Sequence, residues 1–220
     1  APNLHIHAGR LDMKQIYSQL TQIRPVCVLD ATHPYADEVT KNIKEACQTA
    51  GVPYMRILRV NTNMTENVTA SAKAHIRVAD SMREAVDLLN DKPYLEKNIL
   101  LTTGSKHLPD YTKIQDYQNR AYLRLLPSPE MLQKAVDTGF LPVHLIAMQG
   151  PFSQELNVAL IKQSGIGVLV TKQSGKSGGF EEKISAAEQT GTDVIVIKRP
   201  KQEDGKNLSE AEAELKKLMT

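Results

Sequence analysis

Short apolar runs rich in Val, Ile and Leu alternate along the chain with segments whose apolar residues recur every three or four positions. The runs have the length and β-branched content of buried strands, whereas the spaced segments have the period of amphipathic helices. The predicted strands are Leu4–His7, Val26–Asp30, Tyr54–Leu58, Ile99–Thr102, Tyr122–Leu126, Val143–Ala147, Val168–Thr171 and Val194–Lys198. The predicted helices are Met13–Ile23, Ala36–Ala50, Met82–Asn90, Glu130–Thr138, Gln154–Gln163, Glu182–Gln189 and Ser209–Leu218. This alternation predicts an α/β fold with parallel sheets that helices cover on both faces.

Two interruptions suggest how the chain divides. The segment Asn61–Lys73 is polar, rich in Asn and Thr and without a clear period, which is typical of a long connection. A second interruption, at Asp91-Lys92-Pro93, follows the helix predicted after that segment. We therefore expect two doubly wound, Rossmann-like domains that comprise residues 1–95 and 96–220.

Composition excludes several classes of function. The net charge is +2 over 220 residues, with no basic tail or stripe and no tryptophan, so nucleic acid is a poor candidate partner. The two cysteines, Cys27 and Cys47, have no disulfide or zinc pattern, and the histidines lack the spacing of metal ligands, so no metal is expected. No apolar run is long enough to cross a membrane and no signal peptide opens the sequence, so we expect a cytoplasmic protein. The oligomeric state is left open.

A turn with the features of an anion-binding site follows the strand predicted at Ile99–Thr102. It contains Thr103, Gly104, Ser105 and Lys106, which combine hydroxyls, a flexible backbone and a positive charge. The spacing of a P-loop is missing. The alternative is an ordinary glycine turn with a solvated lysine, and we favour the binding site.

A second such turn follows the strand predicted at Val143–Ala147. Ser153 is suited to cap the next helix, and this role alone would explain it. Capping does not explain the polar side chain of Gln149 at the strand end, which could hydrogen-bond a ligand. The candidate binding residues of this turn are Gln149, Gly150, Pro151 and Ser153.

The loop after the strand predicted at Val168–Thr171 gives the strongest signal. Glycines allow close approach of the backbone to a ligand, and lysines supply charge. A flexible loop has a similar composition, but this one directly follows a buried strand, which favours binding. Its candidate binding residues are Thr171, Lys172, Ser174, Gly175, Lys176, Gly178 and Gly179. We expect Gly104, Gly150 and Gly178 to converge around one polyanionic ligand.

The sequence Asp-Ala-Thr-His-Pro-Tyr at residues 30–35 ends another predicted strand. Ligands of open α/β sheets bind at such carboxyl ends, so Thr32, His33 and Tyr35 are candidates for the site. The alternative is that Asp30 or Thr32 only caps the next helix and that His33 is an ordinary surface residue.

Seven segments together resemble the precorrin-6A reductases and cobalt-precorrin-6A reductases of cobalamin biosynthesis. They are LDATHPYA (29–36), GVPYMRILR (51–59), LLTTGSK (100–106), RLLP (124–127), IAMQGPFS (146–153), VTKQSGKSGG (170–179) and VIKRP (196–200). Members of this family usually open with a strand and a Gly-Gly-Thr turn. By that comparison, the first domain lacks its initial βαβ portion, and Gln173 stands where many relatives have an acidic residue.

The resemblance implies an oxidoreductase that uses NADPH or NADH to reduce a ring double bond of precorrin-6A to give precorrin-6B. The tetrapyrrole substrate carries many acetate and propionate groups, which Lys106, Lys172 and Lys176 are suited to hold. His33 is the candidate proton donor, because imidazole transfers protons near neutral pH. The alternatives are a transferase that acts on a similar macrocycle and a non-catalytic protein that binds an anionic tetrapyrrole or nucleotide. We find no glycine-rich adenosine loop after an early strand, which a transferase would need.

Overall fold

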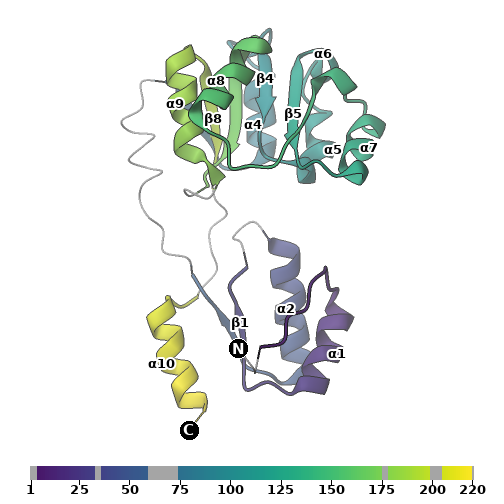
Figure 1. Cartoon of the computed structure of the whole chain (residues 1–220), viewed down its shortest axis with the longest axis vertical. Coiled ribbons are helices and arrows are strands. Elements are labelled where there is room, and N and C mark those ends of the chain that lie inside the picture. The colour runs from purple at the N-terminus through teal and green to yellow at the C-terminus, as the bar shows by residue number, and fades with distance from the viewer. Residues whose placement is uncertain (1–3, 33–35, 59–73, 175–177, 199–204, 220) are drawn as a thin grey trace. The chain divides into compact units, whose positions relative to one another are not determined.

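The computed structural model describes residues 4–32, 36–58, 74–174, 178–198 and 205–219 (Figure 1). The chain forms two compact units, one of residues 1–61 with 200–220 and the other of residues 62–199. This division differs from the predicted boundary near residue 95. The difference arises because a strand before that boundary pairs within the larger unit, whereas the C-terminal helix belongs to the smaller one.

The larger unit is built on a six-stranded sheet in which all neighbouring strands are parallel, in the order β3-β8-β7-β4-β5-β6. The strands are β3 (Ile76–Ala79), β4 (Asn98–Leu101), β5 (Ala121–Leu125), β6 (Leu145–Ala147), β7 (Ile166–Lys172) and β8 (Asp193–Ile197). The helices are α4 (Met82–Leu89), η1 (Ser105–His107), α5 (Leu108–Tyr111), α6 (Tyr117–Arg120), α7 (Pro129–Asp137), η2 (Pro142–His144), α8 (Gln154–Gln163) and α9 (Phe180–Thr190). The predicted α/β class with parallel sheets is confirmed.

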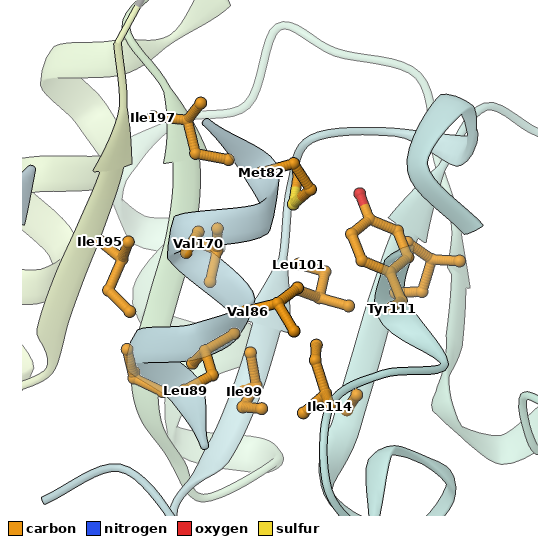
Figure 2. Packing of buried hydrophobic residues seen from close by; sticks show 14 of the residues in the cluster. Met82, Val86, Leu89, Ile99, Leu101, Tyr111, Ile114, Val170, Ile195 and Ile197 are labelled. Atoms are coloured by element: carbon orange, nitrogen blue, oxygen red, sulfur yellow. The ribbon is translucent and has the colours of Figure 1, made fainter. Parts of the chain in front are cut away.

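Side chains that alternate along each strand supply two separate cores. On β4, Ile99 and Leu101 join the cluster that α4 and α5 cover, whereas Leu100 joins the cluster that α8 and α9 cover. Figure 2 shows the first cluster, in which Val86 and Leu89 of α4 lie near the strand residues. Burial of both faces explains why the strands are continuous apolar runs rather than alternating ones.

The order of the strands reverses direction between β4 and β7. From β4 the chain continues to β5 and β6 on one side, then returns through α8 to β7, and continues from there to β8 on the other side. The loops that leave β4 and β7 therefore diverge from adjacent strand ends. Such a switch point leaves a crevice at the carboxyl edge of the sheet, where α/β proteins bind their ligands.

The smaller unit contains a two-stranded parallel sheet. Its elements are α1 (Met13–Ile23), β1 (Val28–Asp30), α2 (Asp37–Ala50), β2 (Tyr54–Arg56) and α10 (Leu208–Leu218). Leu20, Ala46 and Cys47 form its buried cluster, against which Val28 and Tyr54 pack. In Figure 1, α10 lies on the side of the strands opposite α2. Its N-terminus is a capping box made by Asn207 and Glu210, two residues earlier than the predicted start.

Several of the predicted elements were wrong or missing. Leu4–His7 is not a strand in the structure, and Leu4 and Ile6 are 64% and 82% exposed, because no neighbouring strand pairs with them. The strand β3 was missed, as were the short helices α5 and α6. The predicted connection Asn61–Lys73 lies outside the described residues. No helix in the described part of the chain is long and apolar enough to cross a lipid bilayer.

Arg120, at the end of α6, connects the turn before α6 with the segment between α4 and β4. Its buried guanidinium donates hydrogen bonds of 2.7–3.1 Å to the backbone carbonyls of Gln115, Tyr94, Lys97 and Leu89. One of these carbonyls ends α4 and two lie in the connection to β4. The Tyr94 carbonyl also accepts a backbone hydrogen bond, from Lys97 N at 3.0 Å, and the Arg120 side chain supplies donors to the other three carbonyls.

We expect Arg120→Met to lower the free energy of unfolding of the larger unit by about 3 kcal/mol or more, because it strands several buried carbonyls. Urea unfolding at neutral pH measures this change. The control is Arg83→Met on the exposed side of α4, which should change stability by less than about 0.5 kcal/mol. Equal losses in the two variants would contradict the role assigned to Arg120.

Candidate functional site

The ends of β4 and β7 are joined by hydrogen bonds at the switch point. The backbone nitrogen and the hydroxyl of Thr102 both donate to the carbonyl of Val170, at 2.9 and 2.8 Å. The next residues turn away at Gly104, whose φ of 80° favours glycine. Tyr111 fixes this turn, because its hydroxyl donates to Gly104 O at 2.9 Å and contacts the hydroxyl of Thr103. The predicted turn at Thr103–Lys106 therefore lies directly beside β7.

The switch point carries positive charge from both loops. Burial lowers the pKa of His107, its hydrogen bond to Asp110 opposes this effect, and the charges of Lys172 and Lys106 lower the pKa further. Lys106 follows β4 and Lys172 ends β7, so the two lysines act on the same imidazole from different loops. This arrangement provides the electrostatic environment that a carboxylate or a phosphate requires.

The loop after β7 depends on its glycines. A Cβ atom on Gly178 would overlap the side chain of Ser174, and Gly179 has a φ of 60° where α9 begins. Lys183 of α9 closes the loop, because its Nζ donates to Gly178 O at 2.7 Å and to Thr171 Oγ1 at 3.3 Å. The predicted residues Gly175 and Lys176 lie outside the described residues.

The turn between β6 and α8 lies next to that loop. A Cβ atom on Gly179 would be 3.8 Å from the carbonyl oxygen of Phe152. Ser153 caps α8, since its Oγ accepts a hydrogen bond from Leu156 N at 3.3 Å. Capping was the role that would by itself explain Ser153 in the sequence. Gln149, Gly150 and Pro151 are exposed, so they are accessible to a ligand.

Buried polar residues that the sequence analysis did not single out form hydrogen bonds at the carboxyl edge of the same sheet. Arg124 of β5 donates from Nη1 to Asn157 Oδ1 at 2.8 Å, and its guanidinium lies 4.1 Å from the centre of the Phe152 ring. Asn157 in turn donates to Ser153 O at 2.8 Å. A charged residue within the apolar run Tyr122–Leu126 was the available signal for Arg124. Lys183, in the first turn of α9, gave no comparable signal.

In the smaller unit, Asp30 is the centre of a buried hydrogen-bond network at the ends of β1 and β2. Its carboxylate accepts hydrogen bonds from the nitrogen and hydroxyl of Thr32 and from the hydroxyl of Tyr54, and it pairs with Arg56 at 2.6 Å. Burial raises the pKa of Asp30, but the bonds from Thr32 and Tyr54 and the charge of Arg56 outweigh it and lower the pKa.

This network changes the interpretation of Thr32. Its hydroxyl donates to Asp30 at 2.7 Å and lies 2.7 Å from Nη1 of Arg56 and 3.1 Å from the hydroxyl of Thr40. These contacts occupy the hydroxyl, so Thr32 is better placed to hold its loop than to bind a ligand. His33 and Tyr35 lie outside the described residues. Sequence analysis did not single out Arg56.

Comparisons with known proteins identify the family of this chain. The family model described as "Precorrin-6x reductase CbiJ/CobK" matches residues 1–217. This chain belongs to that family. It is therefore a reductase of the cobalamin biosynthetic family and, as such, works with a nicotinamide cofactor.

Individual relatives have the same description. A cobalt-precorrin-6A reductase of Priestia megaterium is 34% identical over 205 residues, which are 91% of this chain and 75% of that protein. One from Salmonella typhimurium (strain LT2) is 34% identical over 197 residues, 89% of this chain and 71% of that protein. A solved structure of a CobK precorrin-6A reductase matches with a TM-score of 0.68 and 25% identity over 96% of this chain and 81% of that one.

Tyr54 tests the network around Asp30. We expect Tyr54→Phe to destabilise the smaller unit by about 1–3 kcal/mol at pH 7, because it removes a hydrogen bond to a buried carboxylate. The pKa of Asp30 is lower in the folded state than in the unfolded state. The hydrogen bonds of its carboxylate therefore stabilise the folded unit at a pH above the unfolded pKa, and this stabilisation is lost as the pH falls through the folded pKa. The loss should therefore shrink in strongly acidic solution.

Chemical unfolding of the wild type and the variant across the acid range measures this difference. Tyr17→Phe is the matched control in the same unit, because the Tyr17 hydroxyl makes no hydrogen bond within the described residues. A loss in Tyr54→Phe that is no larger than in Tyr17→Phe would refute the role of the network.

Lys183 should make the stability of the larger unit depend on pH. Burial first, and then the nearby charge of Arg124, lower the pKa of Lys183 from 10.5 to about 8, although Glu182 opposes them. Between these values the unfolded state binds a proton that the folded state has released, so stability rises with pH. We expect the stability of the wild type relative to Lys183→Met to increase from pH 8 to pH 10.5. Lys162→Met, on the exposed side of α8, should show no such change in denaturant unfolding.

Proposed function

We propose that this reductase transfers hydride from NADPH or NADH to a ring carbon of precorrin-6A or cobalt-precorrin-6A and forms the corresponding precorrin-6B. The family match over residues 1–217 is the observation that carries the proposal. It also favours a reductase over the transferase and the non-catalytic binding protein that the sequence alone left open.

The residues at the carboxyl edge of the larger unit fit a polyanionic ligand. The switch point combines the positive charges of Lys106 and Lys172 with the flexible turn at Gly104. The neighbouring loop is closed tightly enough that a side chain at Gly178 would overlap Ser174. Either the carboxylates of the tetrapyrrole or the pyrophosphate of the dinucleotide would be bound by such a surface. We propose as binding residues of this unit Thr103, Gly104, Ser105, Lys106, Gln149, Gly150, Pro151, Ser153, Thr171, Lys172, Ser174, Gly175, Lys176, Gly178 and Gly179.

The cofactor supplies the hydride, and the protein has to orient the substrate and provide a proton. Orientation by charges on two different loops fixes the macrocycle in more than one direction, which lowers the entropic barrier to the reaction. We propose that the imidazole of His33 donates the proton next to the reduced carbon. The network of Asp30, Thr32 and Arg56 supports this assignment, since it holds the backbone that leads into His33. We further propose that Tyr35 contacts the substrate from the same loop and that Thr32 positions it.

We expect the protein to oxidise a reduced nicotinamide dinucleotide only when precorrin-6A or its cobalt complex is present. Parallel assays with NADPH and NADH, and with the metal-free and cobalt-containing substrates, determine which pair is used.

Lys172→Gln should raise the KM for the ligand bound at the switch point, the precorrin or the dinucleotide, about tenfold with little change in kcat. The reason is that it removes binding that is equal in the ground and transition states. Lys134→Gln, on the exposed side of α7, should leave both constants unchanged. No oxidation with any of the four pairs would overturn the proposed function.

A further inference from the structure

Two buried cations lie on one face of the sheet at the carboxyl edge. Arg124 extends from β5 and Lys183 from α9, and each residue is only 6% exposed. Arg124 faces the layer that holds α8, since the adjacent residues Leu123 and Leu125 belong to the core on the other face. The charge of Arg124 lowers the pKa of Lys183, so the two cations act on each other through the protein interior. Like charges that are well buried repel each other with little screening by water.

The described part of the chain does not neutralise Arg124. Its guanidinium donates one hydrogen bond, to the uncharged side chain of Asn157, and otherwise lies against the ring of Phe152. No carboxylate among the described residues is within 4.0 Å of it. A guanidinium carries further N–H donors that match a carboxylate in a paired geometry. Burial without a counter-ion lowers the pKa of Arg124 to about 10.

The acidic residue that precedes Lys183 does not complete the cluster. Glu182 precedes Lys183 and raises its pKa, but this effect is smaller than the opposing effect of Arg124. One carboxylate oxygen of Glu182, Oε2, is buried and has no hydrogen-bond partner within the described residues. The cluster thus contains an excess of positive charge together with an acceptor that lacks a donor. Both are unfavourable inside a protein unless another group satisfies them.

The cluster lies against two of the turns that form the candidate site. Asn157 connects Arg124 to the carbonyl of Ser153, and Phe152 belongs to the same turn. Lys183 is bonded to the carbonyl of Gly178 in the loop after β7. An anion bound at Arg124 would therefore lie beside the glycine turns that already suggest a ligand. The ring of Phe152 would shield it from water and so strengthen the ion pair.

We propose that Arg124 and Lys183 form a subsite for one carboxylate group of the tetrapyrrole substrate. Arg124 contacts the carboxylate, and Lys183 supplies the second charge while it fixes the loop at Gly178. Glu182 accepts a hydrogen bond from a donor of the ligand. This inference rests on the proposed function, because the carboxylate is one of the acidic side groups of the precorrin ring.

The test compares Arg124→Gln and Arg124→Lys with the wild type and with Lys162→Gln as the matched control. Arg124→Gln should raise both the KM and the Kd for precorrin-6A about 10- to 100-fold, because a charge-assisted pair is lost. Arg124→Lys keeps the charge but loses the paired N–H donors of the guanidinium, so the KM and Kd for precorrin-6A should increase about three- to tenfold. In both variants kcat should stay within about threefold, the KM for the nicotinamide dinucleotide should be unchanged, and Lys162→Gln should behave as the wild type.

Direct titration of precorrin-6A, followed by its absorbance, separates this inference from the proposed function. If the wild type binds precorrin-6A but does not oxidise the dinucleotide, the reductase assignment fails and the subsite is still tested by the Kd. Urea unfolding identifies variants that have lost their fold, and if Arg124→Gln is one of them, Arg124→Lys decides the question. An unchanged Kd in a folded variant overturns the subsite. An effect on the dinucleotide alone also overturns it, since the anion would then be a phosphate.

Discussion

The pairing of β4 with β7 is the constraint on which the rest of the larger unit depends. These strands are separated by about two βα units in the sequence, yet they are adjacent in the sheet, with Ile99 opposite Val168 and Leu101 opposite Val170. The chain must return from β6 across the sheet to make this pairing. Because the connections from the two strands then run in opposite directions, the turn at Gly104 and the loop after Lys172 diverge, which is the arrangement at which open α/β sheets bind their ligands. A sheet wound in one direction would bring helices over both strand ends and close that edge.

Polar side chains enter the core on one face of the sheet near its carboxyl edge. Strand residues that face α8 and α9 are apolar along most of their length, as Leu100 and Leu169 show, but Thr171 and Arg124 occupy this face near the carboxyl edge. The hydroxyl of Thr171 is used by Lys183, and the guanidinium of Arg124 by Asn157. The apolar layer thus changes into a polar one over a single turn of each flanking helix. This transition provides positive charge that is held in a fixed direction by packed secondary structure, which loops alone would not achieve.

Much of this architecture was predictable from the sequence because its strands are buried on both faces. A continuous run such as Ile99–Leu101 or Val194–Ile197 is typical of a strand at the centre of a parallel sheet. The positions of the candidate turns followed directly, since each must come after such a strand. The same reasoning failed for Leu4–His7, where alternation in a short segment also arises without a partner strand. It missed β3, which is short and has an arginine at its second position. The boundary near residue 95 was misplaced because a local break in pattern cannot show which distant strand β3 pairs with.

The side chains that organise the site were harder to predict, because their roles depend on contacts between segments far apart in the sequence. Arg56 lies 26 positions from Asp30, and its ion pair exists only because β1 and β2 are parallel and in register at those residues. Arg124 and Lys183 are farther apart still, one on a strand and the other on a helix, and they influence each other electrostatically. In a sequence, a lone charged residue within or beside an apolar run is ambiguous between an edge position and a buried pair. Burial removes this ambiguity, because a cation without water must have a partner in the protein or in a ligand. Arg56 has its partner in Asp30, whereas Arg124 has only a neutral amide and an aromatic ring within the described residues. Because Arg56 is neutralised by Asp30 and Arg124 has no such partner within the described residues, we assign a structural role to Arg56 and ligand binding to Arg124.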